Sequence, residues 1–326
     1  LIGRKEVFMG KAKFGIFGDG KEVAQIAKAK FFQNGDWRSG YYRDQTFMMA
    51  LGQLTSQQFF AQLYAHTDVD AEPASAGRMM NGHFGTRSLN SKGEWRTLTD
   101  MKNSSSDISC TAGQMPRLIG LGWASKLYRE NPALQEFKDF SINGNEVAFG
   151  TIGNASTSEG HFLEAMNAAG VLQIPMVMSV WDDFYGISVP QQYHTTKESI
   201  SEALSGMQRS ADKKGFEIFK VNGWDYAALL NTYEKAVKLA REEHVPCLVH
   251  VEEVTQPQGH STSGSHERYK NTERLQWEKK NDCNQKFREW ILLNNIASEE
   301  ELFDLEKQIK AEVKAGKTKA WNDFIK

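Results

Sequence analysis

Two short segments rich in oxygen-bearing side chains offer the clearest chemistry in this sequence. Residues 153–160 follow a buried-looking apolar run and contain Asn154. Residues 181–186 follow the next such run and contain Asp182 and Asp183. Mg²⁺ prefers hard oxygen ligands, commonly one or two carboxylates together with phosphate oxygens and water. If the two segments lie side by side, they could hold a magnesium ion and a phosphate group.

The elements around these segments predict a parallel sheet. Strands that alternate with helices favour βαβ units, and hence an α/β fold with a doubly wound, mostly parallel sheet flanked by helices. Ligands of such sheets bind beyond the carboxyl ends of the strands, where both polar segments would lie. Ser156 and Glu159 have capping-box spacing, and free N–H groups at a helix start attract anions. The expected strands are 147–152, 176–180, 216–221 and 247–251, and the expected helices between them are 162–169 and 226–240.

The rest of the chain predicts helices and two irregular polar segments. Helical spacing of apolar residues recurs at about 21–31, 47–65 and 115–128. The polar segments, about 70–108 and 255–268, are of a length that is usually functional or mobile. A capping box at Ser298 and Glu301 opens a helical end. We predict one main domain, 1–270, and a helical C-terminal extension, 271–326.

Composition excludes several classes of protein. The 326 residues are 40% hydrophobic and 25% charged, which is typical of a globular protein. A net charge of -2 gives no general attraction to nucleic acid or to an anionic membrane. No apolar run reaches the roughly 18 residues that a membrane span requires, and no secretory signal opens the chain. The three cysteines form neither a disulfide framework nor a zinc pattern. We therefore expect a reducing interior, such as a bacterial cytoplasm, rather than secretion.

With these residues in view, the chain resembles the alpha subunits of thiamine-diphosphate-dependent 2-oxo acid dehydrogenases. Enzymes that use this cofactor share a motif that opens Gly-Asp-Gly and closes with Asn-Asn. Its opening resembles Gly153, Asn154 and Ala155, and its close resembles Asp182 and Asp183. The likeness continues through 158–160 and 185–190 and is nearest in look to branched-chain 2-oxo acid and pyruvate dehydrogenase first components. It implies the thiamine diphosphate-binding fold of the diphosphate-binding type, with Mg²⁺.

The metal-binding residues depart from the family pattern. The family usually has an acid at the position of Asn154 and an amide at the position of Asp183, so the two side-chain types are exchanged here. One carboxylate and one amide oxygen remain, and the formal charge is kept. The resemblance implies that Asn154, Asp183 and the backbone carbonyl of Tyr185 ligate Mg²⁺. From the residues alone, Asn154 and Asp183 could instead only cap turns.

The resemblance also assigns residues to the cofactor's diphosphate and rings. Tyr42 and Arg43 resemble a pair that reaches the diphosphate, and the rigid donor fork of Arg suits a phosphate. A Tyr-Arg pair taken alone would be read as part of a surface salt bridge. The stretch from Ser109 to Thr111 matches one that touches the aminopyrimidine and thiazolium rings, with Cys110 as a spectator.

Two histidines are the candidate catalytic residues. His83 lies in a stretch, 77–85, that resembles a loop of the branched-chain members, where the matching His is near the reacting centre. His260 lies in a loop, 259–263, whose matching His approaches the diphosphate and the substrate. A lone His is more often structural, and the second loop could be only a polar, disordered segment. Gln256 stands where the family commonly has Arg, which puts the loop's phosphate contact in doubt.

The implied function is that of an enzyme component with partners. It would decarboxylate a 2-oxo acid on thiamine diphosphate and pass the acyl group to a lipoyl arm on a second component. The family's activating Glu comes from a beta subunit, so we expect a beta subunit or fused beta half and no activity from this chain alone. The alternatives are a related thiamine enzyme such as acetoin dehydrogenase, or a degenerate, non-catalytic subunit. Nicotinamide binding fails because no Gly-x-Gly-x-x-Gly turn follows a strand.

Overall fold

The computed structural model describes residues 1–326, which form two compact units. Unit 1 comprises Leu1–Ile26, Tyr42–His83 and Thr255–Lys326. Unit 2 comprises Ala27–Tyr41 and Phe84–Val254. Neither unit is a continuous stretch of sequence. The domain boundary expected between residues 270 and 271 stays a prediction.

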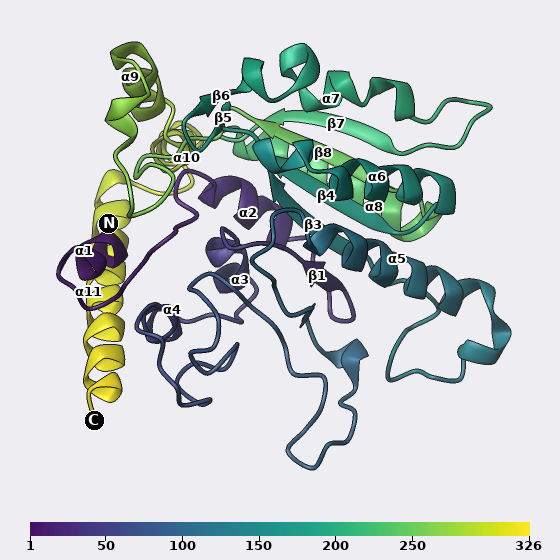
Figure 1. The fold of residues 1–326 in the computed structure, drawn as a ribbon, viewed down its shortest axis with the longest axis horizontal. Coiled ribbons are helices and arrows are strands. Elements are labelled where there is room, and N and C mark those ends of the chain that lie inside the picture. The colour runs from purple at the N-terminus through teal and green to yellow at the C-terminus, as the bar shows by residue number, and fades with distance from the viewer. The chain divides into compact units, whose positions relative to one another are not determined.

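Unit 2 is built on a six-stranded parallel sheet with the strand order β2-β1-β3-β4-β8-β7 (Figure 1). The central strands β3 and β4 pair along their whole length, and their residues are buried almost without exception. Strands that are buried on both faces have continuous apolar sequences, and this pattern made β3 and β4 predictable. The strands are β1 (Trp37–Ser39), β2 (Asn103–Ser104), β3 (Ala148–Gly153), β4 (Met176–Trp181), β7 (Glu217–Asn222) and β8 (Cys247–Glu252).

Helices cover both faces of this sheet. Alternate residues of a strand point to opposite faces, and β4 illustrates the division. Met178 belongs to a core cluster with Phe162 of α6, whereas Ser179 accepts a hydrogen bond from the Tyr233 hydroxyl of α8 at 3.0 Å. The doubly wound, mostly parallel α/β fold is confirmed. The long helices of this unit are α5 (Gln114–Glu130), α6 (Gly160–Leu172) and α8 (Tyr226–Glu243).

A compact series of short elements joins β4 to β7. It begins with a two-stranded antiparallel hairpin, continues through two 3-10 turns and a short helix, and ends in a third 3-10 turn. The elements are β5 (Tyr185–Gly186), β6 (Val189–Pro190), η4 (Gln191–Tyr193), η5 (Thr196–Glu198), α7 (Ile200–Ala203) and η6 (Ser205–Met207).

Unit 1 is helical. Its small core packs α4 against the last helix of the chain, with the Tyr64 and Trp321 rings 5.1 Å apart at an edge-to-face angle. Thr55 and Ser298 each form a complete capping box at the start of these two helices, the second as predicted. The helices are α1 (Ile2–Phe8), α2 (Glu22–Ala29, which continues into unit 2), α3 (Gln45–Ala50), α4 (Ser56–Leu63), α9 (Thr272–Lys280), α10 (Cys283–Leu293) and α11 (Glu299–Phe324).

Two local expectations were wrong. The helix expected over 47–65 is two helices, α3 and α4, because Gly52 has a φ of +76° and ends the first one. The capping box expected at Ser156 and Glu159 does not form. Residues 155–158 make a 3-10 turn, η3 (Ala155–Ser158), and α6 begins at Gly160 with no side-chain cap.

No helix in the structure combines the length and the hydrophobicity that crossing a membrane demands.

Candidate functional site

The carboxyl ends of β3 and β4 bring the two polar segments together. Gly153 pairs with Trp181 in the parallel ladder, so the chains leave the sheet side by side. The Asn154 N–H then donates to the Trp181 carbonyl at 3.1 Å. The site predicted at this edge of the sheet therefore has its two halves in contact.

Asn154 carries the feature that most suggests a ligand. Its side chain is 3% exposed, and its amide nitrogen has no hydrogen-bond partner in the chain. A buried polar group without a partner costs about 1–3 kcal/mol, and native proteins seldom leave one unexplained. Because an amide can be turned to present either its nitrogen or its oxygen, this position suits a phosphate oxygen or a metal ion.

The turn after β4 places Asp183 and Tyr185 beside this amide's segment. Asp183 is 7% exposed, and its Oδ1 accepts the Tyr185 N–H at 3.3 Å. A Cβ added to Gly186 would lie 2.6 Å from the Ala155 Cβ, so the β5 strand approaches η3 as closely as only glycine allows. The opening and the close of the motif thus meet at the carboxyl edge of the sheet.

The donor set of this edge fits Mg²⁺ in kind. Asp183 offers a carboxylate, Asn154 an amide and Tyr185 a backbone carbonyl, and all three can present hard oxygen to a metal. A single carboxylate also leaves charge for a diphosphate to neutralise. The assignment of these three residues as metal ligands stays a prediction.

His194 is a residue of this region that the sequence did not reveal. Its Nδ1 lies 2.9 Å from the Thr195 hydroxyl, and its Nε2 is buried without a partner. Burial lowers the pKa of His194, and the negative charges of Asp182 and Asp183 oppose that shift. A mostly neutral imidazole facing the two acids could donate one hydrogen bond to a bound anion. No spacing rule marks it, since only the fold carries residue 194 back to the strand ends.

The start of α5 lies at the same edge of the sheet. Gln114, the first residue of this helix, donates through Nε2 to the Thr151 carbonyl of β3 at 2.9 Å. The Ser39 hydroxyl of β1 in turn donates to the Gln114 carbonyl at 3.0 Å. Ser109 and Thr111, which immediately precede this helix, are both exposed. Both residues are therefore accessible to a ligand at this edge, and their contact with the cofactor rings stays a prediction.

The other predicted residues belong to unit 1, where they form a chain of contacts. One Arg43 nitrogen lies 3.1 Å from Nδ1 of His260 and donates to the His260 carbonyl at 3.0 Å. The Arg43 guanidinium also lies over the Tyr42 ring, 5.3 Å from its centroid. The Tyr42 ring is 6.5 Å from that of His83. Unit 1 therefore gathers the two predicted diphosphate residues and both predicted catalytic histidines.

His83 and His260 differ in exposure within this cluster. His83 is fully buried, with Nδ1 3.0 Å from the Met80 carbonyl, whereas His260 is half-buried. Two hydrogen bonds hold the loop that carries His260: the Thr262 N–H donates to the Gly15 carbonyl at 3.0 Å, and the Thr262 hydroxyl accepts the Gly15 N–H at 2.9 Å. The position of His260 therefore depends on a loop, and that of His83 on the core of unit 1.

A buried lysine lies beside the unusual Gln256. The Lys21 ammonium is 2% exposed and donates to Gln256 Oε1 and to the Thr255 carbonyl, both at 3.1 Å. The sequence replaces the family's Arg by Gln256, but the fold supplies a cation within hydrogen-bond distance of that position. The sequence alone does not predict the contact between Lys21 and Gln256, because the two residues are far apart in the chain.

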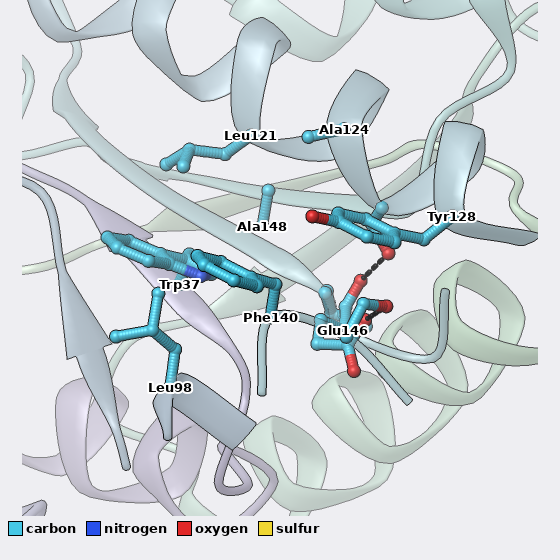
Figure 2. Close-up of a pocket in the computed structure, with 11 residues that line it drawn as sticks. Trp37, Leu98, Leu121, Ala124, Tyr128, Phe140, Glu146 and Ala148 are labelled. Carbon is cyan, nitrogen blue, oxygen red and sulfur yellow. Dashed lines mark hydrogen bonds between the residues drawn. The ribbon is translucent and has the colours of Figure 1, made fainter. Parts of the chain in front are cut away.

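A separate cavity of about 190 Å³ lies at the opposite, amino end of the unit 2 sheet. The rings of Trp37, Phe140 and Tyr128 border it in Figure 2. Glu146 lies in its wall, and its carboxylate accepts hydrogen bonds from Ser141 Oγ and Ile142 N at 2.5 and 2.6 Å. Apolar walls and one saturated carboxylate do not suit a diphosphate. The cavity is lined by Trp37, Leu98, Leu121, Ala124, Ser125, Tyr128, Phe140, Ser141, Glu146, Val147 and Ala148.

Fold and site together define an open parallel α/β protein with a polar ligand site at the carboxyl edge of its sheet. The chain belongs to the dehydrogenase E1 component family, whose pattern matches residues 6–325. It is 27% identical over 292 residues to the 2-oxoisovalerate dehydrogenase subunit alpha of Bacillus subtilis (strain 168), covering 89% of this chain and 77% of that one.

Two further relatives widen the comparison. The mitochondrial 2-oxoisovalerate dehydrogenase subunit alpha of Homo sapiens is 25% identical over 308 residues, which are 93% of this chain and 60% of that one. The pyruvate dehydrogenase E1 component subunit alpha of Rickettsia bellii (strain RML369-C) is 26% identical over 170 residues, covering 52% and 49%. This chain therefore spans only part of these relatives' length.

These findings confirm the predicted kinship with alpha components of 2-oxo acid dehydrogenases, the predicted fold and, through the family, thiamine diphosphate as cofactor. They do not test individual site residues.

Proposed function

We propose that this chain is the alpha component of a 2-oxo acid dehydrogenase that decarboxylates its substrate on thiamine diphosphate held by Mg²⁺. The acyl group would pass to a lipoyl arm on an acyltransferase component. The observation that supports this most directly is the buried Asn154 amide, which has no partner for its nitrogen and lies at the strand end beside Asp183. Both residues fall in the motif at which this family holds its cofactor.

The residues of unit 2 would hold the metal and the anion. Asn154 and Asp183 would each give one side-chain oxygen to Mg²⁺, and Tyr185 its backbone carbonyl. His194 could donate through Nε2 to a diphosphate oxygen, and Ser109 and Thr111 would border the rings. When bound, thiamine diphosphate supplies the carbon nucleophile and the electron sink for decarboxylation.

The residues of unit 1 would bind the diphosphate and the substrate. Arg43 presents a planar fork of donors, which is well suited to phosphate oxygens. His260 shares hydrogen bonds with Arg43, so movement of its loop would shift both groups together. His83, held by the Met80 carbonyl, would keep a fixed orientation near the reacting centre.

A beta subunit or fused beta half would complete the site, so this chain alone is expected to be inactive. The substrate we propose is a branched-chain 2-oxo acid. It is supported by the 2-oxoisovalerate specificity in the names of several relatives and by the resemblance of the His83 loop to the branched-chain members.

Calorimetric titration of thiamine diphosphate into the chain, with its beta partner present, tests the proposal. We expect binding in Mg²⁺ and little in EDTA, and loss of binding in Asp183→Ala. Asp225→Ala is the matched control: it removes the carboxylate that caps α8 through Ala228 N, costs about 0.5–2 kcal/mol of stability, and should bind normally. Absence of binding by the assembled wild-type complex would mean that the chain is a non-catalytic relative.

A further inference from the structure

Asp182, next to the proposed metal ligand Asp183, has no exposed surface and is a hydrogen-bond acceptor for three groups. Its Oδ1 accepts the Phe184 N–H at 2.9 Å. Its Oδ2 accepts Gln191 Nε2 at 2.8 Å and His250 Nε2 at 2.9 Å. The bonds to Phe184 and Gln191 connect the end of β4 to the two ends of the hairpin formed by β5 and β6.

His250 extends the contact to a neighbouring strand and a helix. It lies on β8, where it pairs in register with Val180 of β4, and it is fully buried. Its Nδ1 is 3.0 Å from the Ser201 hydroxyl of α7. With Asp182 as the acceptor, Nε2 is the nitrogen of His250 that carries the hydrogen of this bond.

We propose that Asp182 and His250 are positioning residues, which fix residues 183–191 on the sheet so that Asp183 and the Tyr185 carbonyl face Asn154. This inference rests on the proposed function for its metal, but its geometry is independent of it. Asp182 binds Phe184 before the hairpin and Gln191 after it, and the Gln191 N–H also donates to the Phe184 carbonyl at 2.9 Å.

The conformation of this turn explains why an anchor is needed. Phe184 has a φ of +66° and Ile187 a φ of +59°, values that bulky residues seldom adopt without outside support. A buried polar pair adds little net stability relative to an apolar pair of the same size. Its advantage here is directional, because the two oxygens of Asp182 fix the positions of the Phe184, Gln191 and His250 donors.

Substitutions that exchange the hydrogen-bond donor and acceptor of the Asp182–His250 pair test the inference. Asp182→Asn keeps the shape but replaces one acceptor oxygen with an amide nitrogen, which must face either the Phe184 N–H or the Gln191 and His250 donors. We expect Mg²⁺-dependent thiamine diphosphate binding by the complex with its beta partner to weaken about 10–100-fold, the usual cost of losing a residue that supports a metal ligand. In the double variant Asp182→Asn/His250→Glu, the asparagine nitrogen can donate to the new carboxylate. The Gln191 amide can turn to present its oxygen. Binding should return to within about fivefold of wild type, because contacting residues couple strongly.

Hydrogen exchange supplies a readout that needs no cofactor. The Phe184 and Gln191 amides should exchange faster in Asp182→Asn and recover in the double variant. If His250→Glu proves unstable, His250→Gln keeps a donor for Asp182 and His250→Leu removes it, so only the leucine variant should weaken binding. Tyr233→Phe is the matched control, because it deletes the buried bond to Ser179 on the same strand and should lower stability while leaving cofactor affinity unchanged.

The outcomes separate the two proposals. A wild-type complex that binds no thiamine diphosphate contradicts the proposed function, and the exchange rates of residues 184 and 191 then decide the positioning role alone. Normal binding and unchanged exchange in Asp182→Asn would overturn the inference. The inference would also be overturned if the loss of cofactor affinity in the double variant equalled the sum of the losses in the two single variants.

Discussion

Asn154 and Glu146, buried at opposite ends of the unit 2 sheet, differ in how fully their hydrogen-bonding groups are paired. At the carboxyl end, the Asn154 amide nitrogen and the His194 Nε2 are buried without partners. At the amino end, each carboxylate oxygen of Glu146 has a donor, and its carbonyl accepts the Ser125 hydroxyl at 2.7 Å. The amino end has an apolar cavity, whereas the carboxyl end has the unfilled hydrogen-bonding capacity that a charged ligand would need. The unsatisfied groups, rather than that cavity, mark the candidate site.

The largest effect that this comparison predicts comes from exchanging the two ligand types at the carboxyl end. Asp183→Asn leaves amides at both positions and removes the only carboxylate, so Mg²⁺-dependent thiamine diphosphate binding should weaken about 100-fold. Adding Asn154→Asp restores one carboxylate in the family's usual arrangement, and affinity should recover. Calorimetry of both variants with the beta partner measures this. Equal losses in the single and double variants would show that the two positions do not share one metal.

A smaller effect is expected at the amino end, on stability alone. Glu146→Gln replaces one acceptor oxygen with a donor that faces Ser141 or the Ile142 N–H, which should lower the free energy of unfolding by about 2 kcal/mol. Thiamine diphosphate affinity should not change. Denaturant unfolding and calorimetry on the same preparations measure both. Glu94→Gln, at an exposed site, is the control and should alter neither. A clear change in affinity would contradict the division between the two ends.

The smallest effect concerns pH. Burial lowers the pKa of His244 to about 4, and its Nε2 lies 2.9 Å from the Gly144 carbonyl. The unfolded chain protonates this histidine near pH 6.5, whereas the folded chain protonates it only near pH 4. The contribution of neutral His244 to the free energy of unfolding is therefore complete above pH 6.5 and is lost as the pH falls toward 4. The loss between pH 6.5 and 5.5 should be about 1 kcal/mol, because over that interval the unfolded chain takes up most of one proton that the folded chain does not bind. His244→Gln keeps a donor and should show a flatter profile of unfolding free energy against pH, whereas His161→Gln, at an exposed site, should match wild type.

Strong local patterns made much of the fold predictable. The four predicted strands agree with β3, β4, β7 and β8 to within about a residue at their ends. β3, β4 and β8 were predictable because strands buried on both faces are largely apolar. β1 and β2 were missed. They have three and two residues, too few to show any periodicity, and they are strands only because β1 pairs with β3 and β2 pairs with β1.

The site was predictable where chemistry and chain order coincide. Asn154 and Asp183 follow apolar runs that become neighbouring strands, so their meeting followed from the parallel topology. Lys21, His194 and His250 could not be found in this way. Lys21 and His250 contact residues far from them in the chain, and only the fold brings the His194 carbonyl to the Ser158 hydroxyl of η3. A single buried lysine or histidine has no spacing that distinguishes it from a core residue.

The two consecutive aspartates in the turn after β4 have different hydrogen-bond partners. Asp182 turns into the protein and accepts from His250, and Asp183 bonds forward along its own turn to Tyr185. Deleting one residue before the pair would carry Asp183 to the position opposite His250, and inserting one would carry Asp182 to the position of Asp183. Surface turns usually tolerate changes in length, but this one should accept substitutions far more readily than any change in its residue count.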